Sequence, residues 1–117
     1  MKLSFYLLFM IFFFIGCAKD DIPKRDISNA KMALAQSDNS IVKEYAPQKL
    51  KKLKTKYKEL DRLINQKKYE EAKFLAQDIQ IQSLLIQKEA SINKLSKKIK
   101  NKEDVLKNNK IDLEEKE

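Results

Sequence analysis

The chain of 117 residues has no histidine, a single glycine and a single cysteine. Without histidine it lacks the commonest general base and metal ligand of proteins. Because Gly16 is its only glycine, it has no glycine-rich loop to bind a phosphate. Tight β-hairpin turns usually require glycine or asparagine at positive φ, so a β-rich fold is disfavoured as well. We therefore predict an all-α protein that is not an enzyme and that holds no metal or other cofactor.

The N-terminal segment has the layout of a secretory signal peptide. After Lys2, residues 3–15 form an almost purely apolar run, which is too short to span a bilayer because a span takes about 20 residues. Gly16 and the lone Cys17 follow, as in a bacterial lipobox, where the thiol is joined to a diacylglycerol before cleavage. We predict a lipoprotein signal peptide over residues 1–16 and a covalent lipid on Cys17. An ordinary signal peptide, or an uncleaved anchor with an incidental cysteine, is the alternative.

A lipid on Cys17 would hold the protein at a membrane, since each buried CH₂ contributes roughly 0.8 kcal/mol. Residues 17–26 are polar and contain Pro23, so we predict a lipidated tether there. Ala18 follows the cysteine, where an aspartate would favour retention in the inner membrane. We therefore expect a lipid-anchored protein of the bacterial envelope, at the outer membrane, on its periplasmic face or at the cell surface.

The chain is basic, with 25 Lys and Arg against 17 Asp and Glu and a formal net charge of +8. In a cytosolic protein this charge would suggest binding to nucleic acid. In the envelope, anionic lipid head groups, acidic glycans or an acidic protein surface are better partners. We therefore predict no nucleic-acid partner.

Apolar residues with helical spacing predict a helical domain over residues 27–101. The first helix is expected to be capped by Asp26 and to end near Tyr45, because the residue before Pro47 is pushed away from the α region. Pro47 suits the first turn of the next helix. The apolar stripe of the first helix consists of Ile27, Ala30, Leu34, Ser37 and Ile41.

The second helix has the clearest pattern, and Asn65 is expected to be its left-handed C-terminal residue. Its apolar stripe, at spacings of 3 and 4, consists of Leu50, Leu53, Tyr57, Leu60 and Ile64. Its opposite side carries the basic row, defined as Lys51, Lys54, Lys58 and Arg62. The basic row is either a solvated helix face or a docking surface for an acidic partner.

The third helix is expected to begin near Tyr69 and to carry two apolar stripes, which predicts contact with more than one neighbour and hence a three-helix arrangement. The first stripe consists of Tyr69, Ala72, Ala76, Ile79, Ser83 and Ile86. The second stripe consists of Ile81, Leu85, Ile92, Leu95 and Ile99. Residues 102–117 form an acidic tail, which we expect to be solvated and frayed; a continued helix, or a tail folded back on the basic second helix, is the alternative.

Two stretches carry a resemblance to known proteins. Tyr45-Ala46-Pro47 together with Tyr69-Glu70-Glu71-Ala72-Lys73-Phe74-Leu75-Ala76 resembles a family of small bacterial envelope lipoproteins of unknown function. That family forms an alanine-rich helical hairpin, which in some members precedes an OmpA-type domain. The resemblance covers about half of the chain and implies a helical hairpin with a scaffold role. This chain departs from the family in having few alanines in its second half and no room for an OmpA-type domain, so we expect no peptidoglycan binding.

The stretch Lys68-Tyr69-Glu70-Glu71-Ala72 also resembles the middle of a tetratricopeptide repeat, the unit of BamD-like lipoproteins. That resemblance implies a tetratricopeptide-like turn and an accessory role in the β-barrel assembly complex. The function expected from the whole sequence is a helical protein-interaction or scaffold module of an envelope complex. A surface-exposed lipoprotein that binds an external ligand is the other class.

Overall fold

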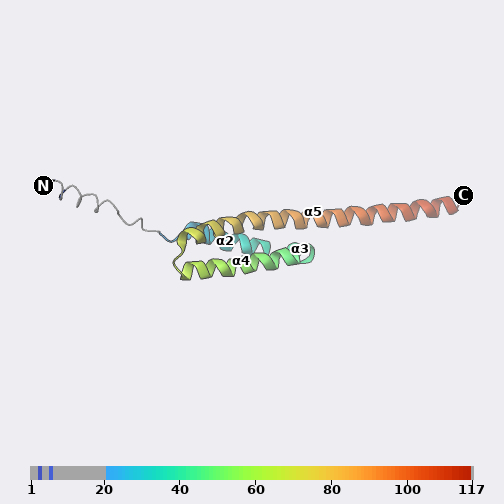
Figure 1. Ribbon diagram of the computed structural model, residues 1–117. Coiled ribbons are helices and arrows are strands. Elements are labelled where there is room, and N and C mark those ends of the chain that lie inside the picture. The colour runs from blue at the N-terminus through green and yellow to red at the C-terminus, as the bar shows by residue number, and fades with distance from the viewer. Residues whose placement is uncertain (1–2, 4–5, 7–20, 117) are drawn as a thin grey trace.

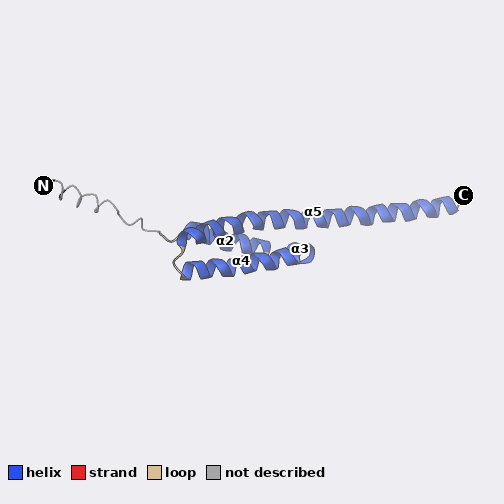
Figure 2. Cartoon of the chain, viewed as in Figure 1, coloured by secondary structure: helices blue, strands red, loops and turns tan. Residues whose placement is uncertain are grey.

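The computed structural model describes Leu3, Tyr6 and residues 21–116. Within residues 21–116 the chain forms α2 (Lys24–Ser37), α3 (Ser40–Tyr45), α4 (Pro47–Asn65) and α5 (Tyr69–Glu115). Figure 2 shows these helices and no strand among the residues described. The prediction of an all-α protein is therefore confirmed.

The helices α2, α4 and α5 lie side by side along the first half of α5 (Figure 1). α2 and α5 run in the same direction. α4, which comes between them in the sequence, runs antiparallel to both (Figure 1). The short α3 leads from α2 into α4 at the far end of this bundle and also contacts α5. Beyond the bundle α5 continues alone, and its 47 residues make it about 70 Å long at 1.5 Å per residue.

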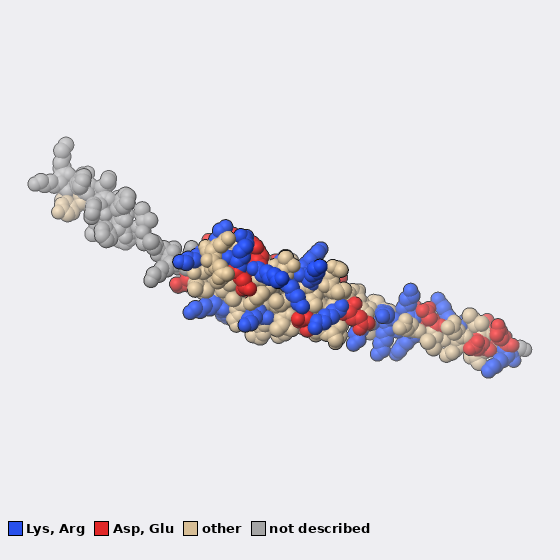
Figure 3. Space-filling view, turned by 90° about the horizontal axis from the view of Figure 1, so that it is seen from below, with Lys and Arg blue, Asp and Glu red and all other residues tan. Residues whose placement is uncertain are grey.

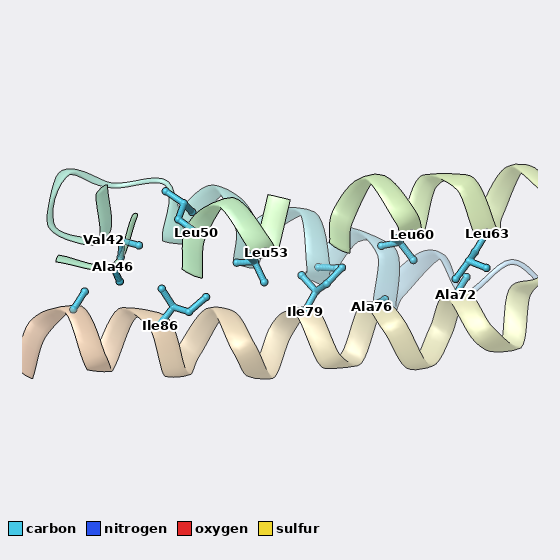
Figure 4. Packing of buried hydrophobic residues seen from close by; sticks show 12 residues of the cluster. Val42, Ala46, Leu50, Leu53, Leu60, Leu63, Ala72, Ala76, Ile79 and Ile86 are labelled. Carbon is cyan, nitrogen blue, oxygen red and sulfur yellow. The ribbon is translucent and has the colours of Figure 1, made fainter. Parts of the chain in front are cut away.

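The core lies between α4, α5 and the α2–α3 segment. Figure 4 shows the leucines of α4 pointing toward small and branched residues of α5. Leu50, Leu53 and Leu60 are buried as the sequence predicts, whereas Tyr57 and Ile64 are only partly buried. The complete buried apolar cluster is Ala30, Val42, Ala46, Leu50, Leu53, Leu60, Leu63, Ala72, Ala76, Ile79, Ile86 and Ala90.

The expected first helix is in fact two helices. α2 begins at Lys24, so Asp26 lies in its first turn and is not its N-cap, and the tether ends earlier than expected. The chain then bends at Asp38 and Asn39 before α3 starts. The Asn39 side chain accepts a hydrogen bond from the Val42 N–H at 3.0 Å. This cap gives the backbone an alternative to a continuous helix.

The turn between α4 and α5 also differs from the prediction. Asn65 is the last residue of α4, and the left-handed residue is Lys67, with φ 59°. The Lys68 N–H donates to the Leu63 carbonyl at 3.0 Å, and the Lys67 N–H donates to the Ile64 carbonyl at 3.0 Å. These two bonds form a Schellman motif, which satisfies carbonyls left free at the end of the helix. The predicted starts at Pro47 and Tyr69 are confirmed.

The acidic tail continues α5 to Glu115, which is the alternative to the frayed tail that we expected, and residue 101 lies within this helix. Every side chain of residues 91–116 is exposed, so the tail does not fold back on α4. The second stripe is exposed as well, from 50% at Ile99 to 63% at Ile92. α5 does contact more than one neighbouring helix, as predicted, but the buried contacts come from the first stripe and not from the second. The physical reason is that both α2 and α4 pack on the side of α5 that carries Ala72, Ile79 and Ile86.

Candidate interaction surfaces

α4 places the basic row on the outside of the bundle. Its leucines face α5, so helical geometry puts the row about 150° away from them around the helix. All four side chains of the row are exposed. Figure 3 shows Lys and Arg side chains over the bundle and along the free end of α5, with Asp and Glu among them. The charge on this face is therefore mixed, and the surroundings of each cation decide what it can bind.

Two members of the basic row are already paired within the molecule. The Lys54 Nζ lies 3.1 Å from Asp38 Oδ2, and the Lys43 Nζ lies 3.1 Å from Asp38 Oδ1. Hydrogen bonds from Lys54 and then Lys43 hold the pKa of Asp38 below its ordinary value. The Arg62 Nε donates to Glu59 Oε2 at 2.8 Å, which lowers the pKa of Glu59 and raises the pKa of Arg62. Both pairs are on the surface, so each contributes little to folding.

Lys51 and Lys58 form no ion pair among the residues that the structure describes. They lie seven residues apart on α4, which is about two helical turns or about 10 Å. The structure therefore divides the predicted row into two neutralised cations and two uncompensated ones. An acidic partner would meet Lys51 and Lys58 first.

An open groove of about 660 Å³ lies between α4 and α5. Its apolar floor includes Leu85, Ile86 and Ile92, and Lys49 pairs with Glu89 across its edge. The complete lining is Lys49, Lys52, Gln82, Leu85, Ile86, Lys88, Glu89 and Ile92. Sequence reasoning did not predict this groove, because it depends on how far apart two helices sit. The second stripe was the signal for it, since Leu85 and Ile92 belong to that stripe.

A small polar cluster is buried between α2 and α5. The Ser83 hydroxyl donates to the Ala33 carbonyl at 2.7 Å and is hydrogen-bonded to the Ser37 hydroxyl. The Gln87 Nε2 donates to Ser83 Oγ at 3.2 Å and to Ser37 Oγ at 3.3 Å. These partners satisfy both buried hydroxyls, so we interpret the cluster as a structural link between helices.

The predicted lipid site Cys17, the signal peptide over residues 1–16 and the start of the tether lie outside the described residues, Leu3 and Tyr6 apart. In the part of the chain that the structure covers, no helix combines the length and apolar character needed to cross a membrane. The same part contains no group of three side chains able to hold a metal ion. Comparison with protein-family models, curated proteins and solved structures found no match to this chain.

Proposed function

We propose that this protein is a non-enzymatic lipoprotein of the bacterial envelope, anchored at the outer membrane through a lipid on Cys17. The observation that carries the proposal is the order of residues at the N-terminus: Lys2, an apolar run over residues 3–15, Gly16 and the chain's lone cysteine. Because Cys17 is the only cysteine, it has no second cysteine in the chain with which to form a disulfide, and its thiol stays available for a lipid. The helical part that follows it would serve as a protein-interaction or scaffold module.

The helical part fits such a module because its surface offers two kinds of contact. Lys51 and Lys58 offer uncompensated positive charge on α4, and the α4–α5 groove offers apolar surface with a lysine rim. We further propose that α4, its turn and α5 correspond to the helical hairpin of small envelope lipoproteins. Buried Ala72 and Ala76 after the partly buried Tyr69 support a tetratricopeptide-like turn at this place.

Replacement of Cys17 by alanine tests the anchor. We expect Cys17→Ala to accumulate as an unprocessed precursor that incorporates no labelled fatty acid, because alanine has no thiol to acylate. The measurement is the mass of the N-terminal peptide together with fatty-acid labelling in cells. Ala18→Ser is the matched control, and it should be processed and labelled normally. A wild-type chain that carries no lipid would refute the proposal, as would normal labelling of Cys17→Ala.

Charge reversal at Lys51 and Lys58 tests the docking surface. We expect Lys51→Glu/Lys58→Glu to reduce copurification of envelope proteins at least several-fold at 0.1 M salt, with unchanged helicity. At 1 M salt the two chains should behave alike, because the Debye length falls from about 10 Å to about 3 Å. The double variant leaves the pairs of Lys54 and Arg62 in place.

The matched control is Lys31→Glu/Lys73→Glu, which makes the same charge change at exposed lysines of α2 and α5. It should retain the partners of the wild type. If the Lys51/Lys58 variant also retains every partner at low salt, the basic row is only a solvated face. Two further observations separate the alternative functions. Recovery of the β-barrel assembly complex with the wild type would favour a BamD-like accessory role. Digestion of the protein by protease added to intact cells would favour a surface-exposed binder.

A further inference from the structure

α5 carries a second apolar face that runs along almost its whole length. Apolar residues recur on this face at spacings that add up to heptads, the pattern of a left-handed coiled coil. We call this face the α5 seam: Phe74, Ile81, Leu85, Ile92, Leu95, Ile99, Leu106 and Leu113. Each of these side chains is at least half exposed, from 50% at Ile99 to 68% at Leu113. The remaining positions of the same spacing are Asp78, Lys88, Lys102 and Asn109.

The α5 seam faces away from α2 and α4 along most of its length, although Leu85 and Ile92 also line the α4–α5 groove. The residues that α5 buries against α2 and α4 include Ala76, Ile79, Ser83 and Ile86. At 100° per residue, the centre of that buried side lies almost 180° from the centre of the seam. A further helix can therefore lie along the seam without displacing α2 or α4.

Beyond Ala90, α5 buries no side chain against another helix of the described chain, although the Lys97 side chain reaches Glu44 and the Tyr45 ring of α3. Residues 91–115 are helical, and all of their side chains are exposed. In water, most of the stability of a helix comes from packing of an apolar face, and an isolated helix is only marginally stable. Apolar residues at heptad spacing on an exposed helix face are the pattern of one strand of a coiled coil.

We propose that a second copy of this chain covers the α5 seam, so that two α5 helices form a parallel coiled coil with one bundle on each outer side. The parallel orientation rests on the proposed function, because it puts both N-termini, and hence both lipid anchors, at the same end. The seam is about 60 Å long from Phe74 to Leu113. A strip of that length and about 12 Å wide approaches the roughly 800 Å² per partner of a stable interface.

Charges beside the seam favour the parallel pairing. In a parallel, in-register pair, the residue just before the first apolar position (a) of a heptad lies near the residue five places further along the other copy. Ile99 is such a first position, and Lys98 precedes it. That rule brings Lys98 of each copy to Glu103 of the other, twice by symmetry. An antiparallel pair centred near residue 97 would instead place Lys98 beside Lys98 and Glu89 beside Glu103. At the positions that flank the seam, the parallel pair thus brings opposite charges together, whereas this antiparallel pair brings like charges together.

Charged residues within the seam limit its strength. Asp78, Lys88 and Lys102 would face their own copies in the parallel pair, which costs stability. The long aliphatic stems of the two lysines can cover the seam while the ammonium groups reach water. Lys102→Leu should therefore bind its second copy at least tenfold more tightly than the wild type.

Sedimentation equilibrium of the full chain in density-matched detergent tests the dimer, with detergent in excess so that two chains rarely share a micelle by chance. We expect two chains per particle for the wild type and one for Ile92→Asp/Ile99→Asp, which puts carboxylates into the seam. Asn101→Asp/Asn108→Asp adds the same charge to α5 away from the seam and should remain a dimer. A monomeric wild type, or a seam variant that stays dimeric, would overturn the proposal. A monomeric wild type would mean that the seam is a binding surface for a different protein.

Oxidative crosslinking of the same preparations tests the orientation. Leu106→Cys should form a disulfide-linked dimer under mild oxidation, because equivalent seam positions face each other only in a parallel, in-register pair. Asn108→Cys, off the seam, should crosslink far less, and the wild type shows the contribution of Cys17. A dimer that does not crosslink at residue 106 contradicts the parallel arrangement. The mass of the N-terminal peptide, measured on the same sample, reports separately whether the proposed lipid anchor holds.

Discussion

Leu60→Asp should unfold the bundle at neutral pH or lower its free energy of unfolding by about 4 kcal/mol or more. Leu60 is 0% exposed. Its side chain points from α4 toward α5 near Ala76 (Figure 4). An aspartate at this place would either bury a charge without a partner or take up a proton, and both cost free energy. Circular dichroism during urea and thermal unfolding measures the effect.

The destabilisation by Leu60→Asp should be smaller near pH 4 than at pH 7, compared with the wild type at each pH. Burial raises the pKa of the introduced carboxyl in the folded state, so the neutral form, which the core tolerates better, becomes accessible as the pH falls. Thr55→Asp is the matched control, since it adds the same side chain to an exposed site of α4. It should change stability by less than about 1 kcal/mol. If Leu60→Asp were as stable as this control, the α4 stripe would face solvent or a partner and would not form the core.

Ser83→Leu should lower the free energy of unfolding by about 3 kcal/mol or more, the second-largest loss of stability that we predict. Ser83 is 1% exposed, and its hydroxyl reaches the α2 backbone at Ala33 over 2.7 Å. A leucine needs space that this close approach does not leave, and overpacking typically costs 1–3 kcal/mol. The substitution also removes the Ser83 hydroxyl as a hydrogen-bond partner of the Ser37 hydroxyl, the Gln87 amide and the Ala33 carbonyl, which adds to the cost.

The measurement for Ser83→Leu is again urea unfolding of the full chain, with Ser28→Leu as control. Ser28 lies on α2 and is exposed, so this control makes the same chemical change without crowding and should be within about 0.5 kcal/mol of the wild type. Ser83→Ala separates the two causes, because it removes the hydrogen bonds but adds no volume. We expect it to cost about 1–2 kcal/mol. An unchanged stability of Ser83→Leu would mean that α2 does not approach α5 as closely as the structure shows.

Local sequence signals located the starts of α4 at Pro47 and of α5 at Tyr69. Pro47 cannot continue a preceding helix and suits the first turn of the next one, so the start of α4 follows from the sequence. The break at Asp38 and Asn39 does not, because an asparagine that caps α3 competes with a continuous helix over a small difference in free energy. The hydrogen bond from Val42 to Asn39 and the burial of Val42 decide that competition in the folded chain.

The pairing of Lys54 with Asp38 could not be predicted from α4 by itself, unlike the pairing of Arg62 with Glu59 three residues earlier in the same helix. Lys51, Lys54, Lys58 and Arg62 look equivalent in the sequence, since each follows the same helical spacing. Asp38 lies in a different segment and reaches Lys54 only because the α2–α3 bend passes beside α4. The basic row is therefore one feature in the sequence and two kinds of cation in the structure.

Sequence periodicity by itself determined that this chain is helical, that Leu50, Leu53 and Leu60 point inward, and that α5 has two apolar faces. Periodicity records which side of a helix is apolar, but it carries no information on what covers that side. Only the tertiary structure decided that Ala72, Ile79 and Ile86 meet α2 and α4 while the second stripe stays exposed. Small residues allow α2 and α4 to approach one side of α5 closely, and the larger side chains of the opposite side are left uncovered.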